Sequence, residues 1–157
     1  FDRENIVEMV TNCIGHYRIP ASKLELEITE SMMMQDTVGV AAKVRELRQA
    51  GIGVAIDDFG TGYSALAYLQ KLPVSVLKID RSFVRDLDGL MTNPIISAIT
   101  GIAKGFGMQI IAEGVEHAQQ ARTLRALGCD VMQGFFFGCP LKADEALSLI
   151  GSTPRAV

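Results

Sequence analysis

Residues 53–62 read Gly-Val-Ala-Ile-Asp-Asp-Phe-Gly-Thr-Gly and place an apolar run, an acidic pair and a glycine-rich loop in direct succession. The run from Gly53 to Ile56 is typical of a buried strand, and Asp57 and Asp58 stand where it ends. Adjacent side chains of a strand point to opposite faces, so both acids can serve one site only if the strand ends between them. An acidic pair at such a corner can hold divalent cations, although Asp-Asp is also a frequent turn signal.

The same arrangement recurs along the chain, because other strand-like runs also end on polar side chains. These side chains are Glu27, Lys78, Asp80, Glu113 and Gln133. Strand ends at one rim of an α/β barrel hold the catalytic groups of such enzymes, so we expect these residues to converge. Converging carboxylates repel one another, and bound divalent cations are the usual remedy. The sequence therefore predicts a two-metal site with Mg²⁺ or Mn²⁺, which suits phosphoester hydrolysis.

Two residues of this set have competing interpretations. Lys78 lies inside the apolar run Leu77-Lys78-Ile79, where a buried cation needs a strong partner. It could position or deprotonate a metal-bound water, since burial among metals lowers a lysine pKa, or it could form an ion pair with Asp80 or Glu27. Gln133 could orient water or substrate, or it could make a hydrogen bond within the barrel.

Two further acids, Glu30 and Glu116, each follow a predicted site residue by three positions. They could hold the neighbouring loop of Gly60, Thr61 and Gly62 in place, or they could be N-terminal helix acids favoured by the helix dipole. The glycine loop by itself is only a weak indication of phosphate binding, because such turns are common.

Strand and helix patterns alternate with little interruption. The predicted strands cover 24–29, 53–58, 75–80, 108–113 and 131–136, and the predicted helices cover 4–16, 36–50, 64–70, 93–106, 117–127 and 143–150. Regular alternation predicts an α/β fold with a parallel sheet, of the TIM-like (β/α) barrel type. A complete barrel needs about 250 residues, so we expect residues 1–157 to hold the last five βα units, with earlier strands upstream of Phe1.

Composition restricts the class of protein. The chain has 157 residues and a formal net charge of −3, which argues against binding to a nucleic-acid polymer. No apolar run reaches the roughly 18 residues that span a membrane, so any anchor of the parent protein belongs to other domains. Three cysteines without Cys-x-x-Cys spacing are expected to be reduced, mostly buried thiols of a cytoplasmic protein.

At this point the residues resemble a known family, the EAL-domain phosphodiesterases of bacteria, which open cyclic di-GMP to linear pGpG. The resemblance covers five strings in the family's order, at 24–30, 57–64, 77–80, 112–116 and 133–135. It implies a TIM-like barrel with Mg²⁺ or Mn²⁺ at its mouth and a role in second-messenger signal transduction.

The resemblance also implies a role for each predicted site residue. The metal ligands would be Glu27, Asp57 and Asp58, and the catalytic residues would be Lys78, which positions the nucleophilic water, Glu113 and Gln133. Glu30 and Glu116 would fix the loop at 59–64, which in this family links dimer contacts to metal binding. Asp80 is assigned to substrate contact or local structure.

Two departures from the family qualify this reading. The Glu-Ala-Leu signature and the asparagine of the third strand would lie upstream of Phe1, so we expect the metal shell to be incomplete and the isolated chain weak or inactive. Cys139 stands where an arginine is common. The alternative is a catalytically silent EAL-like domain that binds cyclic di-GMP or a protein partner. Unpaired sheet edges also predict homodimerisation or another form of self-association.

Overall fold

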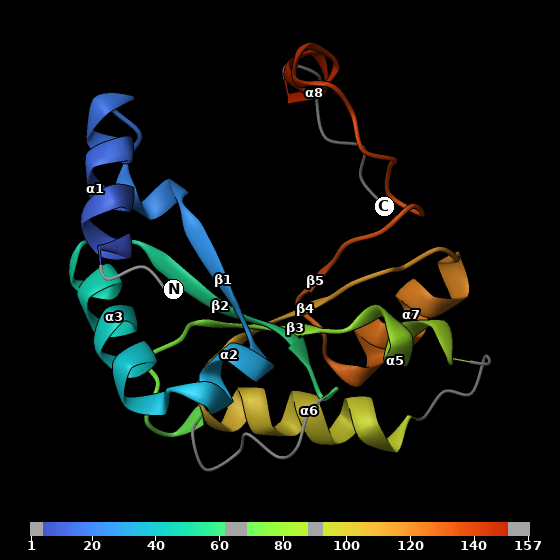
Figure 1. Cartoon of the computed structure of the whole chain (residues 1–157). Coiled ribbons are helices and arrows are strands. Elements are labelled where there is room, and N and C mark those ends of the chain that lie inside the picture. The colour runs from blue at the N-terminus through green and yellow to red at the C-terminus, as the bar shows by residue number, and fades with distance from the viewer. Residues whose placement is uncertain (1–4, 62–68, 88–92, 151–157) are drawn as a thin grey trace.

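A computed structural model of the chain describes residues 5–61, 69–87 and 93–150. Its centre is a five-stranded sheet in the order β1-β2-β3-β4-β5, and every neighbouring pair is parallel (Figure 1). The strands are β1 Glu25–Thr29, β2 Gly53–Phe59, β3 Val76–Ile79, β4 Gln109–Ala112 and β5 Val131–Met132. Sequential parallel strands, with helices in the described connections from β1 to β2, β3 to β4 and β4 to β5, confirm the predicted α/β class.

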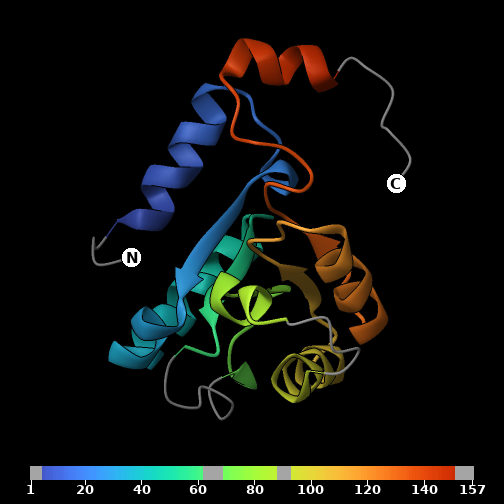
Figure 2. The same ribbon diagram turned by 90° about the vertical axis from the view of Figure 1, so that its right-hand side faces the viewer.

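The described helices are α1 Ile6–His16, α2 Glu30–Gln35, α3 Thr37–Gln49, α5 Arg81–Arg85, α6 Pro94–Gly105, α7 Ala118–Leu127 and α8 Ala143–Ile150, with a short 3₁₀ turn, η1 Ala21–Lys23. Helix α3 packs on β2, and α6 packs on β3 and β4 (Figure 1). Viewed from the side in Figure 2, α8 lies at the opposite end of the molecule from α6. No helix of the described part is both long and apolar enough to cross a membrane.

Local sequence signals explain where the covering helices begin and end. Asp36 caps α3, its side chain accepting a hydrogen bond from the backbone N–H of Gly39. Asn93 caps α6, and Pro94 occupies its first turn, where a missing backbone N–H costs nothing. Gly51 follows α3 with φ of +82°, a left-handed conformation that glycine adopts without steric cost.

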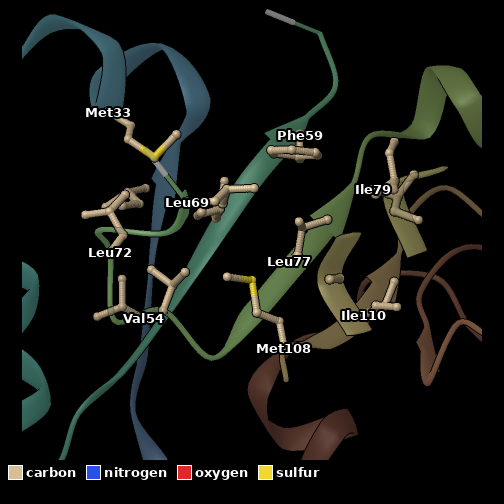
Figure 3. Close-up of a cluster of buried hydrophobic side chains, with 14 of the residues drawn as sticks. Met33, Val54, Phe59, Leu69, Leu72, Leu77, Ile79, Met108 and Ile110 are labelled. Carbon is tan, nitrogen blue, oxygen red and sulfur yellow. The ribbon is translucent and has the colours of Figure 1, made fainter. Parts of the chain in front are cut away.

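The two faces of the sheet differ in chemistry because strand side chains alternate. One face belongs to the apolar core beneath the helices, where Val54, Leu77, Ile79 and Ile110 are packed together (Figure 3). The opposite face carries the intervening residues, which include Asp57 and Lys78. The helices therefore cover one side, and the polar strand-end residues share the other.

Several local elements differ from the prediction. Residues 32–34 are helical in α2, because Thr29 caps the helix through the backbone N–H of Met32. Helix α5, capped by Asp80, was not predicted. Strand β5 ends at Met132, since Gly134 opens a turn with φ of +156°. Most of the predicted helix at 64–70 lies outside the described residues.

The prediction that the cysteines are mostly buried was wrong, because two of the three are exposed. All three are free thiols, but Cys13 and Cys139 are exposed and only Cys129 is buried. Burial, reinforced by the charge of Asp130, raises the pKa of Cys129 to about 11.

Candidate active site

Lys78 lies at the centre of the polar face and contacts three carboxylates from three different strands or strand ends. Its Nζ atom is 2.7 Å from Glu27 Oε1, 3.0 Å from Asp57 Oδ1 and 2.6 Å from Glu113 Oε1. Parallel pairing produces this convergence, because the carboxyl ends of β1, β2, β3 and β4 lie side by side. Of the two ion pairs considered from the sequence, the one with Glu27 is present.

The environment of Lys78 fixes its charge. The residue is only 5% exposed, and burial alone would lower its pKa. Hydrogen bonds to Glu113, Glu27 and Asp57 outweigh burial and raise the pKa above the ordinary lysine value. Lys78 is therefore an ammonium donor in this structure.

A bulge in β2 brings Asp57 and Asp58 to the same rim. Ile56 pairs with Leu77 and Phe59 with Ile79, so β2 has one more residue than β3 over this interval. Asp58 takes the extra position with φ of +54°, a left-handed conformation that aspartate tolerates better than most residues. The sequence argument required the strand to end between the two acids, but β2 continues through both to Phe59. The bulge redirects the side chains instead.

Asp58 and Asp80 form a second acidic pair beside the first cluster. Burial raises the pKa of Asp58, and the charges of Asp57 and Asp80 reinforce the increase. Burial also acts to raise the pKa of Asp80, but hydrogen bonds from the Ser82 hydroxyl and backbone N–H outweigh it and lower this pKa overall. Asp80 is thus the N-cap of α5, which supports the local-structure alternative for this residue.

The donor set suits a hard divalent cation. Asp57 Oδ1 is buried, and within the described residues no hydrogen bond of good geometry reaches it beyond the ion contact with Lys78. The Lys78 ammonium also demonstrates that a positive charge fits among these carboxylates. In the described part of the chain, however, no three acidic, histidine or cysteine side chains form a ready-made metal cage. The residues fit Mg²⁺ or Mn²⁺ by chemistry, and in this structure Lys78 partly offsets their charge.

The glycine loop is tied to the start of α2. Buried Glu30 accepts a hydrogen bond at Oε2 from the backbone N–H of Gly60, 3.0 Å away. The Thr61 hydroxyl donates to the carbonyl of Asp58 at 2.8 Å, which closes the turn. Gly60 has φ of +98°, and a Cβ there would lie 2.9 Å from the Phe83 ring. Gly62 lies outside the described residues.

Glu113, Gln133 and Glu116 border a common cavity next to the Lys78 cluster. Glu113 and Gln133 line one cavity of about 210 Å³, together with Arg81, Glu116 and Phe135. Glu116 is exposed, and its backbone N–H donates to the side-chain oxygen of buried Gln120. The structure therefore joins Glu30 to the glycine loop and places Glu116 at this cavity. A loop-positioning role for Glu116 stays a prediction.

The sequence argument overlooked Arg81 and Phe135. Both line the cavity that contains Glu113, and Arg81 also lines a larger one of about 560 Å³ with Asp80 and Arg85. A signal was present, because each residue follows a proposed site residue within two positions.

Comparison with known proteins places this fold and site in one family. The family profile described as "EAL domain" matches residues 1–140, so the chain belongs to the EAL-domain family. Among curated relatives, the bifunctional diguanylate cyclase/cyclic di-GMP phosphodiesterase MucR of Pseudomonas aeruginosa is 40% identical over 96% of this chain. The oxygen sensor protein DosP of Escherichia coli is 40% identical over 92% of it. The chain spans only 22% of MucR and 18% of DosP.

Solved structures agree with this membership. The PaMucR phosphodiesterase in complex with c-di-GMP superposes with a TM-score of 0.86 at 40% identity, covering 92% of this chain and 64% of that one. The EAL domain of Mycobacterium smegmatis DcpA gives 0.88 at 41% identity, covering 98% and 70%. Klebsiella pneumoniae BlrP1, solved with manganese and cyclic di-GMP, gives 0.79 at 27% identity, covering 88% and 36%. These neighbours are EAL TIM-barrel domains, and this chain covers part of such a barrel.

Proposed function

We propose that this chain is part of a metal-dependent phosphodiesterase that hydrolyses cyclic di-GMP to linear pGpG. The observation that supports this most directly is the meeting of Glu27, Asp57 and Glu113 around Lys78 at the carboxyl ends of neighbouring parallel strands. Family membership supplies the reaction class, and relatives of the chain are described as cyclic di-GMP phosphodiesterases.

The proposed metal site uses the carboxylates of Glu27, Asp57 and Asp58, with Mg²⁺ or Mn²⁺ as the cation. A divalent metal pair would supply charge neutralisation of the scissile phosphate and activation of the attacking water. The relative BlrP1 has been solved with cyclic di-GMP and either calcium or manganese, which supports divalent-metal use in the family.

The chain's own residues would orient the reaction. Lys78 is a three-proton donor, and its Nζ lies among Glu27, Asp57 and Glu113, so Lys78 would hold the attacking water beside the metal-binding carboxylates. Glu113 Oε1 keeps Lys78 protonated from one side. Gln133 and Glu113 border the same cavity, where the amide of Gln133 could bind substrate or water.

We further propose that residues 1–157 correspond to strands 4 to 8 of the barrel with their helices. Upstream strands would then supply the remaining metal ligands. Both edges of the described sheet, β1 and β5, have only one neighbouring strand among the described residues. Such edges favour pairing with other chain segments, which supports homodimerisation or self-association. A cytoplasmic location would follow from the proposed second-messenger substrate.

A silent, cyclic di-GMP-binding domain is the second candidate. One observation favours it: the Lys78 ammonium already contacts three carboxylates, and no ready-made metal cage exists among the described residues. In that case the chain would bind the dinucleotide without forming pGpG.

The decisive experiment follows pGpG formation from cyclic di-GMP with Mg²⁺ or Mn²⁺, using this chain and a longer version that includes upstream residues of its gene. Glu27→Ala should abolish product, whereas Glu46→Ala, a change on the exposed surface of α3, should not. Binding of cyclic di-GMP without product in the longer version would support the silent domain. If the longer version neither binds cyclic di-GMP nor forms pGpG, both proposed functions are refuted.

A further inference from the structure

Gln120 is a buried amide that has no part in the proposed hydrolytic chemistry. It lies in the first turn of α7 and does not border the two cavities described above. Its Oε1 accepts hydrogen bonds from the backbone N–H groups of Glu116, at 2.8 Å, and His117, at 3.0 Å. Its Nε2 donates to the Val84 carbonyl at 3.1 Å. A buried amide is tolerated only when it is bonded in this way, so the three contacts explain its place in the core.

These contacts join α7 to the segments that follow two neighbouring strands. Val84 lies in α5, the helix that Asp80 caps at the end of β3. Glu116 follows Glu113 in the loop after β4. Helices α5 and α7 lie side by side in Figure 1, and the bond from Gln120 to Val84 links them. Gln120 therefore fixes the loop after β4 relative to α5.

Close packing makes this loop sensitive to the position of α5. Gly114 has φ of +72°, and a Cβ there would lie 2.5 Å from Cβ of Arg81, the first residue of α5. The loop backbone thus lies directly against the start of the helix. A displacement of α5 would be passed to the loop, because no flexible side chain separates them.

The same loop is bonded to the segment that contains Gln133. The Val115 N–H donates to the Gln133 carbonyl at 3.0 Å, and the Gln133 N–H donates to the Ala112 carbonyl at 2.9 Å. Val115 stands between Glu113 and Glu116, so Gln120 holds the loop two residues from one proposed catalytic residue and is one backbone bond from the other. A shift of the loop would therefore move both Glu113 and Gln133.

The set of partners requires an amide. Two N–H groups need an acceptor and one carbonyl needs a donor, so these partners fix the orientation of the Gln120 amide. A carboxylate could accept from both N–H groups but could not donate to Val84. The thioether of methionine, of similar length, would serve neither purpose well. Glutamate and methionine therefore separate the acceptor from the donor role.

We infer that Gln120 is a positioning residue for the proposed hydrolysis, which holds the loop after β4 so that Glu113 and Gln133 keep their places beside Lys78. The inference rests on the proposed function. Misplacement of reacting groups by about 1 Å can reduce a rate by roughly 10²-fold, even when its cause is distant from the chemistry. Loss of the Gln120 contacts should therefore lower kcat more than it changes KM.

The test compares Gln120→Met and Gln120→Glu in the longer version of the chain. Hydrogen exchange of the Glu116 and His117 amides, followed by NMR without metal, measures the contact itself. Gln120→Met should speed this exchange by about tenfold or more, whereas Gln120→Glu, which keeps an acceptor, should change it by less than about threefold. With Mn²⁺, Gln120→Met should lower kcat for cyclic di-GMP by about tenfold or more and change KM by less than about threefold. Gln120→Glu should retain most of kcat.

Gln119→Met is the matched control, because it makes the same replacement one position earlier in α7. Gln119 is exposed, and its Oε1 accepts a hydrogen bond from exposed Arg122 at 2.7 Å. Its removal should change neither the exchange of the two amides nor kcat. If Gln120→Met does not fold, Gln120→Asn replaces it with the same expected results, since its amide is one methylene shorter and cannot reach all three partners.

The outcomes separate the inference from the proposed function. If the two amides lose protection but kcat stays unchanged, Gln120 serves the fold alone, and the inference fails while the proposed function stands. If Gln120→Glu keeps the amides protected yet loses as much kcat as Gln120→Met, action through the loop is excluded. A loss in the Gln119 variant equal to that in the Gln120 variant would also count against it. If the unaltered protein forms no pGpG, the proposed function fails, and the positioning role fails with it.

Discussion

Lys78 and Glu113 link adjacent strands through an ion pair of 2.6 Å between Nζ and Oε1. The backbone aligns them, because Lys78 pairs with Ile111 in the parallel register and the Glu113 N–H donates to the Ile79 carbonyl. Two further carboxylates approach the same nitrogen from β1 and β2. One buried ammonium therefore joins three carboxylates that come from β1, β2 and the end of β4.

Lys78→Met should destabilise the metal-free protein and make its stability depend on divalent cations. Removing the cation leaves three carboxylates in mutual repulsion. We expect a loss of about 2 kcal/mol, below the roughly 3–5 kcal/mol for a broken buried pair, because solvent screens the partly exposed carboxylates. Thermal unfolding with and without Mn²⁺ should reveal a larger stabilisation by metal in the variant than in the unaltered protein.

Lys71→Met is the control for this change, since Lys71 is exposed and lies outside the carboxylate cluster. Its stability should stay within about 0.5 kcal/mol of the original, with the same response to Mn²⁺. Equal responses in the Lys78 and Lys71 variants would contradict the idea that a divalent cation can replace the ammonium.

Gly60→Ala should destabilise the loop that follows the acidic pair. Its φ of +98° is unfavourable for alanine, and the new Cβ would press on Phe83 and Ile99. We expect a loss of about 2 kcal/mol or more, together with weaker metal binding. Gly101→Ala in the exposed face of α6 is the matched control: nothing lies within 4 Å of its Cβ position, so stability should rise by about 0.5–1 kcal/mol.

Glu30→Ala should destabilise the glycine loop by removing the side chain that binds the Gly60 backbone. The backbone N–H of Gly60 would lose its acceptor, at a cost of about 1–3 kcal/mol. Glu30→Gln keeps a side-chain oxygen at this position and should recover much of the loss. Chemical denaturation of the three proteins would measure this order, and equal losses for both variants would assign the effect to charge rather than to the hydrogen bond.

Cys129 should react far more slowly than the other two thiols. Its pKa of about 11 leaves little thiolate near neutral pH, and burial blocks access, whereas Cys13 and Cys139 are exposed. Timed alkylation with iodoacetamide, followed by peptide mass spectrometry, should label Cys129 only on unfolding. Early labelling of Cys129 would argue against its burial in the core.

The same shift has a consequence for stability at high pH. The folded pKa of Cys129 is above the ordinary thiol value of 9.0, so between about pH 9 and 11 the folded state retains a proton that the unfolded state releases. Stability should therefore fall as pH rises through that window. Cys129→Ala should be less stable overall but should show a shallower decline, which denaturant titrations at several pH values would measure.

The order of strands and helices could be predicted from the sequence, but the geometry at the strand ends could not. Alternating apolar runs depend on nearby residues, so local patterns predict the strands and helices that they form. The bulge at Asp58 depends on register with β3, and the pKa of Lys78 depends on acids from three separate segments. Neither long-range property can be read from local periodicity.

Gly134 lies against the backbone of Val115, so the turn after β5 packs directly on the loop after β4. A Cβ at Gly134 would overlap backbone atoms of Val115, whose N–H donates to the Gln133 carbonyl. Backbone cannot yield as a flexible side chain can, so Gly134→Ala should cost about 3 kcal/mol or more and displace Gln133. Gly138→Ala, four residues further along, has nothing within 4 Å of its Cβ position and should be close to neutral. A melting temperature for Gly134→Ala equal to that of Gly138→Ala would show that this close approach does not hold the active-site segments together.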